Sequence, residues 1–202
     1  MIGVYTKKIG NMWFGVTYEE QRVFGASFAV SNEEALRCLL SGIPFNVPFQ
    51  VFQEPTAFAE KVLASVKNVY DGKDTTQGFA LAMEHLPAYT RRVLEVTALI
   101  PTGYVASYGA IAKAAGGGAR AVGNVMARNS FAPFVPCHRV VSSDLTLGGY
   151  GGGLDVKHDF LVREKRGYTS PRQIPVDGKK LQVFPVEFVL KKVKAKNCDA
   201  RS

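Results

Sequence analysis

Two short helical segments joined by three consecutive glycines, within residues 107–128, constrain the fold of this 202-residue chain more than any other feature. Ser107 can cap a helix that runs to about Ala115, Gly116-Gly117-Gly118 forms the turn, and a second helix follows over 119–128. Two short helices joined by a glycine turn are typical of a helix-turn-helix, which places its second helix in a DNA groove. Ordinary helical hairpins share this pattern, so it requires support from the rest of the chain.

Basic residues are concentrated in the half of the chain that contains these two helices. Residues 1–87 carry 7 basic and 9 acidic side chains, whereas residues 88–202 carry 18 basic and 8 acidic ones. A basic excess attracts polyanions, although it can also serve solubility alone. Its coincidence with the helical pair favours a nucleic-acid-binding surface in the second half.

The chain has a predicted boundary at Leu86-Pro87, where a proline interrupts a helical pattern and the charge balance changes. Before it we expect strands over 10–18 and 21–28, helices beginning near Ser31 and Thr56, and a short helix over 76–83. After it we expect a helix over 89–100. We therefore predict an N-terminal α/β domain over 1–87, a DNA-binding domain over 88–169 and a basic extension over 170–202.

The extension contains an apolar run over 183–190, followed by lysines at 191, 192, 194 and 196. This run is too hydrophobic for a free tail, and we expect it to dock on the body as an extended strand.

Composition excludes several classes of protein. With 47% hydrophobic residues, the chain can bury a core. Cys38, Cys137 and Cys198 form neither a disulfide framework nor a CxxC clamp, which favours a reducing, intracellular compartment. The N-terminus lacks the apolar core of a signal peptide, and no apolar run is long enough for a membrane span. His85 has only Cys38 as a companion in the first half, so we expect no metal site.

Pro136-Cys137-His138-Arg139-Val140 places a thiol beside an imidazole, shortly after the helical pair. Thiolate is the nucleophile in sulfur chemistry, and a free cysteine holds little of it at neutral pH unless a base or a positive field lowers its pKa. His138 and Arg139 could supply both the base and the positive field. Neighbouring side chains of an extended segment point to opposite sides, so we expect His138 to reach Cys137 through a water. A Cys-His peptidase would use the same pair, but it would need neither the helical pair nor the basic half.

Between residues 89 and 167 the chain resembles the O6-alkylguanine-DNA alkyltransferases, a family of DNA repair proteins. The resemblance rests on five blocks in the family's order and spacing: Ser107-Tyr108, Ala119-Arg120-Ala121-Val122-Gly123, Arg128-Asn129, Pro136 to Val141, and Tyr150-Gly151-Gly152-Gly153-Leu154. It implies an α+β fold, in which an N-terminal ribonuclease H-like α/β domain precedes a mainly helical, winged-helix-like DNA-binding domain with a helix-turn-helix. It also implies irreversible, single-turnover transfer of an alkyl group from guanine O6 to Cys137, without a cofactor. Some relatives hold a zinc ion in the first domain with cysteine and histidine ligands, but this chain has too few of these residues there, so we expect no zinc.

The resemblance gives each matching residue a role. Cys137 accepts the alkyl group, His138 acts as its base, and Glu164 orients the imidazole. Tyr108 presses on the DNA backbone and donates its hydroxyl to guanine N3, while Arg120 fills the place of the flipped nucleotide. The outer face of the second helix carries mostly small residues, which let a helix approach a nucleic-acid groove, so we also expect DNA contacts at Ala121, Gly123, Asn124 and Arg128. The resemblance further implies a guanine pocket of Val140, Tyr150 and Gly151 and a structural tie at Asn129.

The implied partner is double-stranded DNA that contains O6-alkylguanine, with O4-alkylthymine as a second candidate substrate. The family also implies a monomer without membrane contact, in the cytoplasm or nucleoid if the source is a prokaryote. An alkylation-responsive regulator and a lesion-sensing DNA-binding protein stay open as alternatives. Relatives that only sense lesions replace the acceptor cysteine, whereas this chain has Cys137.

Overall fold

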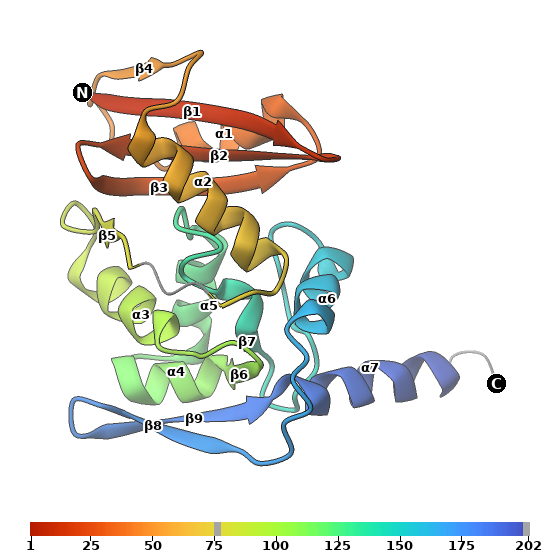
Figure 1. Ribbon diagram of the computed structural model, residues 1–202. Helices are drawn as coiled ribbons and strands as arrows, with labels where there is room; N and C mark the ends of the chain where they lie inside the picture. The colour runs from red at the N-terminus through yellow and green to blue at the C-terminus, as the bar shows by residue number, and fades with distance from the viewer. Residues whose placement is uncertain (75–77, 200–202) are drawn as a thin grey trace. The chain divides into compact units, whose positions relative to one another are not determined.

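The computed structural model describes residues 1–74 and 78–199, the last four of these as backbone alone. Contacts divide the chain into two compact units, Met1–Pro87 with Ser130–Phe134, and Ala88–Asn129 with the chain from Val135 onward. Both units combine helices with strands (Figure 1), so the fold is α+β.

A five-stranded sheet in the order β4-β1-β2-β3-β5 forms the centre of the first unit. β1 (Ile2–Ile9), β2 (Met12–Glu19) and β3 (Arg22–Ala29) are antiparallel neighbours. The turns between them contain Gly10 and Glu20, both with positive φ, as tight hairpins require. β4 (Phe49–Val51) and β5 (Ala80–Leu81) add parallel edges.

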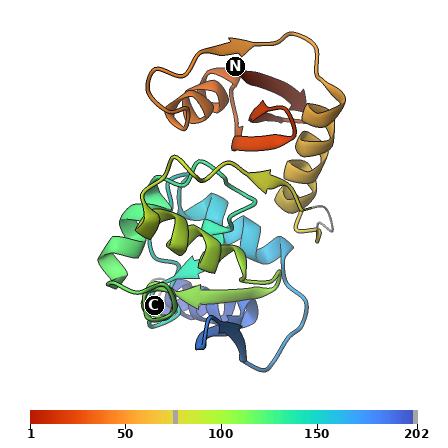
Figure 2. The same cartoon turned by 90° about the vertical axis from the view of Figure 1, so that its left-hand side faces the viewer.

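Two helices, α1 (Asn32–Ser41) and α2 (Ala57–Tyr70), cover opposite faces of this sheet (Figures 1 and 2). Alternation along β2 explains the arrangement, because Phe14 and Val16 pack into one core with α2, whereas Gly15 lies directly under Leu39 of α1. Ser31 caps α1 as predicted, and Thr56, where the second helix was expected to begin, caps α2. The side chain of each accepts from the amide three residues further on.

The second unit is built on a four-stranded sheet in the order β7-β6-β9-β8. β6 (Tyr104–Ser107) pairs in parallel with β7 (Val140–Val141) and antiparallel with β9 (Lys179–Pro185), which forms a hairpin with β8 (Arg172–Val176). The helices of this unit are α3 (Ala88–Ala98), α4 (Tyr108–Ala115), α5 (Ala119–Ala127), α6 (Leu154–Arg163) and α7 (Val186–Asp199).

The predicted glycine turn connects α4 to α5, and Ser107 caps α4 as expected. Gly116 and Gly117 have φ values of +92° and +84°. A Cβ atom on Gly117 would lie only 2.6 Å from the hydroxyl oxygen of Tyr89 in α3. Glycine is therefore required at Gly117 both by backbone conformation and by the close packing of α3.

Three expectations differ from the structure. First, β1 is a strand that was not expected. Second, the expected helix over 76–83 is wrong for the residues that the structure describes, because Ala80–Leu81 pairs with β3 as a strand. Residues 76 and 77 of that expected helix lie outside the described residues. The expected strand over 183–190 ends at Pro185, where α7 begins. The apolar residues Val186, Val189, Leu190 and Val193 recur at helical rather than alternating spacing, which accounts for this difference.

Candidate active site

Cys137 begins a single 3-10 turn, Cys137–Arg139 (labelled η1), instead of the extended segment expected from the sequence. The turn closes because the amide of Val140 donates to the carbonyl of Cys137, and Val140 then enters β7 beside Ala106 of β6. The Cys137 residue is only 8% exposed. The thiol is therefore anchored on the sheet of the second unit and largely shielded from solvent.

His138 is fully buried, with its Nε2 atom 2.8 Å from Oε1 of Glu164 and its ring stacked on Phe160. Because the Glu164 carboxylate accepts hydrogen bonds, the hydrogen of a neutral imidazole belongs on Nε2 and the lone pair on Nδ1. Nδ1 is buried and has no hydrogen-bond partner among the described residues. This geometry leaves Nδ1 able to accept a proton.

Arg139 is the second partner of Glu164. Its Nε lies 2.9 Å from Oε2 and its Nη2 lies 2.8 Å from Oε1, while Nη1 donates to the carbonyl of Ile100. Burial alone would raise the pKa of Glu164, but the charges and hydrogen bonds of His138 and Arg139 lower it to about 2. Arg139 is thus bound to the carboxylate and does not serve the thiol, contrary to the expectation from the sequence.

This buried ion pair predicts a stability effect. Arg139→Ala would leave a buried carboxylate with one of its two partners, so the free energy of unfolding should fall by about 3–5 kcal/mol. Arg91→Ala is the control, because Arg91 forms an exposed pair with Glu95 at 3.9 Å and its loss should cost less than about 1 kcal/mol. Urea unfolding of both variants measures the difference, and equal losses would contradict the assigned role of the buried pair.

Burial determines the protonation of Cys137 and His138. It raises the pKa of the Cys137 thiol, against the opposing hydrogen bond of Asn129 and the charge of Lys157. Burial also lowers the pKa of His138, although Glu164 opposes the shift. The resting pair is therefore a neutral thiol and a neutral imidazole, and not the thiolate that a positive field would produce.

Tyr108 and Tyr150 lie close to the thiol. The Tyr108 hydroxyl donates to the carbonyl of Gly149 at 3.2 Å, and Tyr150 forms a hydrogen bond with Cys137. Burial, and secondarily the charge of Cys137, raises the pKa of both tyrosines. Both phenols consequently keep their hydrogens and can act as donors.

Lys157 is a buried cation that the sequence analysis missed. Its Nζ donates to the carbonyls of Val140 at 2.5 Å and Gly149 at 3.0 Å. Burial lowers its pKa to about 8, although Cys137 opposes the shift, so the ammonium form still predominates at neutral pH. Helical spacing could have revealed it, since Lys157, Phe160, Leu161 and Glu164 form one buried face of α6 and its C-cap.

The expected DNA-contacting residues lie on or beside α5. Arg120 and Asn124 are exposed, Ala121 and Gly123 are half-buried, and Val122 and Val125 face the core. Arg128 is exposed at the C-cap. Asn129 follows, and its Nδ2 donates to the carbonyl of Val135 at 2.8 Å, which joins the end of α5 to the segment before Cys137.

Gly151 lies exposed in the turn before α6, next to Tyr150. Within the described residues there is no cluster of three or more His, Cys, Asp or Glu side chains suited to a metal ion. In the same part of the chain, no helix has the length and apolar character that crossing a membrane requires.

Sequence comparison matches residues 88–166 to a family model described as the DNA-binding domain of 6-O-methylguanine DNA methyltransferase. The methylated-DNA–protein-cysteine methyltransferase of Methanothermobacter thermautotrophicus is 36% identical over 111 residues, which span 54% of this chain and 63% of that protein, just under two thirds of its length. The protein of the same name from Thermococcus gammatolerans is 31% identical over 159 residues, or 76% of this chain and 89% of its own length.

Structural comparison gives the same relationship. The O6-methylguanine-DNA methyltransferase of Pyrococcus kodakaraensis superposes with a TM-score of 0.61 and 30% identity over 81% of this chain and 99% of that chain. The structure of Mycobacterium tuberculosis OGT in complex with DNA superposes with a TM-score of 0.64 and 25% identity, over 81% of this chain and 92% of that chain. Since the Thermococcus relative is matched over nearly its whole length at 31% identity, this chain belongs to the methylated-DNA–protein-cysteine methyltransferase family.

Proposed function

We propose that this protein repairs DNA by transferring an alkyl group from O6 of guanine to Sγ of Cys137, once per molecule. The observation that carries the proposal is a buried thiol beside a buried imidazole whose Nδ1 is unpaired and whose Nε2 is held by Glu164. Membership of the methyltransferase family supports the same reaction.

In the proposed step, a bond forms between Sγ and the alkyl carbon as the bond between that carbon and O6 breaks. The thiol proton passes through a water to Nδ1 of His138, and Glu164 stabilises the imidazolium that results. Because the resting thiol is neutral, the proton leaves as the sulfur attacks. The thioether product is chemically inert, so each molecule acts once and needs no cofactor.

The departing guanine gains negative charge, which a hydrogen-bond donor at N3 would stabilise. We assign this role to Tyr108, because burial raises the pKa of its phenol and keeps the hydrogen in place. The main-chain carbonyls of Cys137 and Val140 accept from the guanine 2-amino group, and the Gly151 amide donates to O6. Lys157 supports this pocket by fixing the Val140 carbonyl.

The alkylated base must leave the duplex to reach a buried thiol, at a cost of a few kcal/mol. We assign insertion into the duplex to α5, with Arg120 filling the vacated position and Ala121, Gly123, Asn124 and Arg128 meeting the DNA. The exposed face of α5 supports this role. The proposed partner is double-stranded DNA with O6-alkylguanine, and O4-alkylthymine is a second candidate substrate.

The first unit is proposed to be ribonuclease H-like and the second winged-helix-like. The mixed sheet of the first unit, covered by helices on both faces, supports the ribonuclease H-like assignment. The arrangement of α4, the glycine turn and α5 supports the winged-helix-like assignment. We further propose that the protein is an intracellular monomer whose first domain ends at residue 87. The predicted extension over 170–202 is not a separate domain, because its described part pairs with β6 and belongs to the second unit.

Intact mass tests the reaction directly. After incubation with an O6-methylguanine duplex, the protein should gain the mass of one CH2 group, because a methyl group replaces the thiol hydrogen. An unmodified duplex of the same sequence is the control. A protein whose mass does not change with either duplex would refute the proposal.

Arg120→Ala should separate base flipping from chemistry. Transfer from duplex DNA should slow by about tenfold or more, because an empty stack position is costly. Transfer from a free benzylated guanine should change little, since no stack has to be filled. Single-turnover rates on the two substrates measure the difference. Equal losses on both would mean that Arg120 supports the guanine pocket or the fold and has no special role in base flipping.

A further inference from the structure

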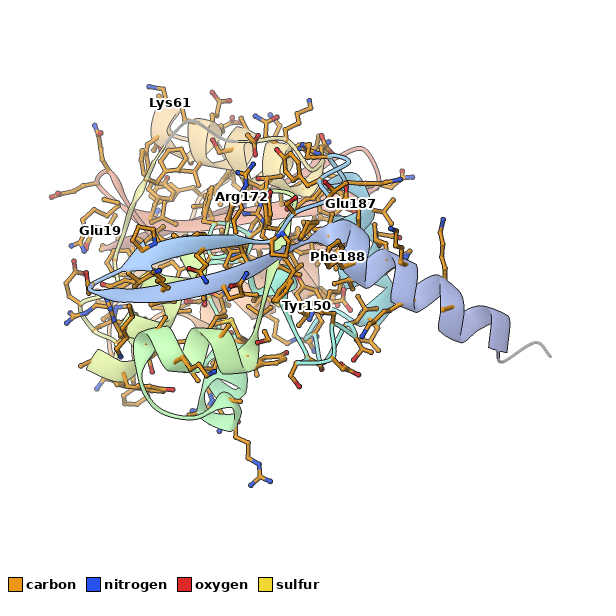
Figure 3. All side chains as sticks on the ribbon, turned by 90° about the horizontal axis from the view of Figure 1, so that it is seen from below. Glu19, Lys61, Tyr150, Arg172, Glu187 and Phe188 are labelled. Atoms are coloured by element: carbon orange, nitrogen blue, oxygen red, sulfur yellow. The ribbon has the colours of Figure 1, made fainter. Side chains whose placement is uncertain are left out.

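The C-terminal segment 170–199 lies beyond the part of the chain that the family model matches. The family model ends at residue 166, and the Pyrococcus structure, matched over 99% of its own chain, covers 81% of this one. The segment nevertheless belongs to the second unit, where β8 and β9 form a hairpin and α7 continues from the end of β9 (Figure 3). Its buried residues include Leu181, Val183, Val186 and Val189.

The hairpin of this segment extends the sheet that carries the acceptor site. β9 pairs with β6, so that Pro185 lies opposite Tyr104 and Phe184 opposite Val105. β6 ends one residue before Tyr108, and its other edge holds β7, which follows the Cys137 turn.

Helix α7 packs against two further elements of the site. Val186, Val189 and Leu190 share a buried cluster with Val141, which follows the Cys137 turn, and with Leu161 of α6. Lys192 donates to the carbonyl of Asp144, in the loop that leads to Gly149. The segment therefore contacts β6, β7, α6 and the loop that contains Asp144.

Glu187 contacts the chain just beyond Glu164, the carboxylate of the proposed proton relay from Cys137 through His138. It lies in the first turn of α7 (Figure 3), and its Oε1 accepts from the amides of Arg166 at 3.1 Å and Gly167 at 2.5 Å. These amides belong to the second and third residues after Glu164. The chain immediately beyond the relay carboxylate is thus held by a side chain from the C-terminal segment.

The other carboxylate oxygen, Oε2 of Glu187, is buried and has no hydrogen-bond partner among the described residues. A buried polar atom without a partner costs about 1–3 kcal/mol. The first turn of α7 does not need the acid to satisfy the amide of Val186, which already donates to the carbonyl of Gly103. The Glu187 carboxylate therefore serves the two amides beyond Glu164 rather than the amide at the start of its own helix.

We infer that Glu187 is a positioning residue of the acceptor site and acts through Glu164. By fixing the chain at residues 166 and 167, it prevents the end of α6 from fraying and keeps the Glu164 carboxylate against His138 and Arg139. The inference rests on the proposed function, which supplies the reaction in which His138 accepts a proton.

Three full-length variants test this role. Glu187→Met keeps the volume and removes the acceptor, Glu187→Gln keeps an acceptor oxygen, and Glu33→Ala removes an exposed acid from the equivalent first turn of α1. The measurement is the single-turnover rate of transfer from a free benzylated guanine, from acid to alkaline pH. The reaction amplitude reports the folded fraction, so a rate constant is obtained independently of stability.

Glu187→Met should react about tenfold more slowly near neutral pH, because small displacements of a catalytic group are costly. The loss should shrink at alkaline pH, where the thiol ionises without the relay. Glu187→Gln and Glu33→Ala should stay close to the wild type. A Glu187→Met rate equal to the wild type, or a loss that is the same at every pH, would overturn the inference alone, whereas a wild-type protein that transfers nothing would refute the proposed function itself.

Discussion

Cys137→Ser is expected to abolish alkyl transfer completely while leaving the binding of lesion DNA intact. A serine hydroxyl is a far weaker nucleophile than a thiol, and His138 cannot compensate for that difference. The substitution removes little volume from a site that is only 8% exposed, so the pocket and α5 should keep their form. Intact mass measures transfer, and fluorescence anisotropy with an O6-methylguanine duplex measures binding.

Cys38→Ser is the matched control, because Cys38 is exposed on α1 and should not affect the reaction. Peptide mass mapping of the wild type should place the alkyl group on Cys137. Transfer that persists in Cys137→Ser, or an alkyl group found on Cys38 or Cys198, would reject the assignment of the acceptor.

His138→Ala is expected to slow transfer by about 10²–10⁴-fold at neutral pH, the range that general base catalysis supplies. The wild-type rate should be nearly constant around neutral pH, since burial lowers the pKa of His138 and keeps the imidazole neutral there. Below that pKa the imidazole becomes protonated and the rate should fall. Without the imidazole the thiol must ionise unaided, and burial holds its pKa above the usual value. The rate of the variant should therefore rise with pH into the alkaline range, so its deficit shrinks.

Glu164→Gln should produce a smaller loss with the same dependence on pH, because an amide oxygen still accepts from Nε2 but cannot stabilise an imidazolium. This variant also removes the charge that pairs with Arg139, so urea unfolding must accompany the kinetics. Single-turnover rates across the pH range, for proteins shown to be folded by circular dichroism, provide the measurement. If the variants retain the wild-type pH profile, a group other than His138 accepts the thiol proton.

Local rules predicted the features that depend on neighbouring residues. Ser31 and Ser107 cap helices as predicted, α2 begins close to Thr56, and Gly117 forms the turn before α5. Features that depend on distant pairing were missed. The two residues of β5 form a strand only because β3 lies beside them, and no local pattern identifies so short an element.

The candidate site shows the same division. The sequence predicted the identities of Cys137, His138 and Glu164 through a family resemblance, but it did not predict their charge states. Desolvation raises the pKa of the Cys137 thiol. The extent of desolvation depends on how the surrounding side chains pack, which no short motif encodes. Lys157 and Arg139 were missed as structural cations for a related reason, since a lysine or arginine in a sequence is normally expected to be solvated.

The five residues Ser130–Phe134 belong to the first unit, although in the sequence they lie between Asn129 and the Cys137 segment, which both belong to the second unit. Ser130 accepts a hydrogen bond from the amide of Ala26, Phe131 is fully buried, and Phe134 packs beside Phe79. The two units are therefore not interchangeable modules. A fragment cloned from residue 88 onward would lose Phe79 and Ala26, the partners of Phe134 and Ser130. A graft of the chain around Cys137 onto another scaffold would need the host to supply matching partners for them.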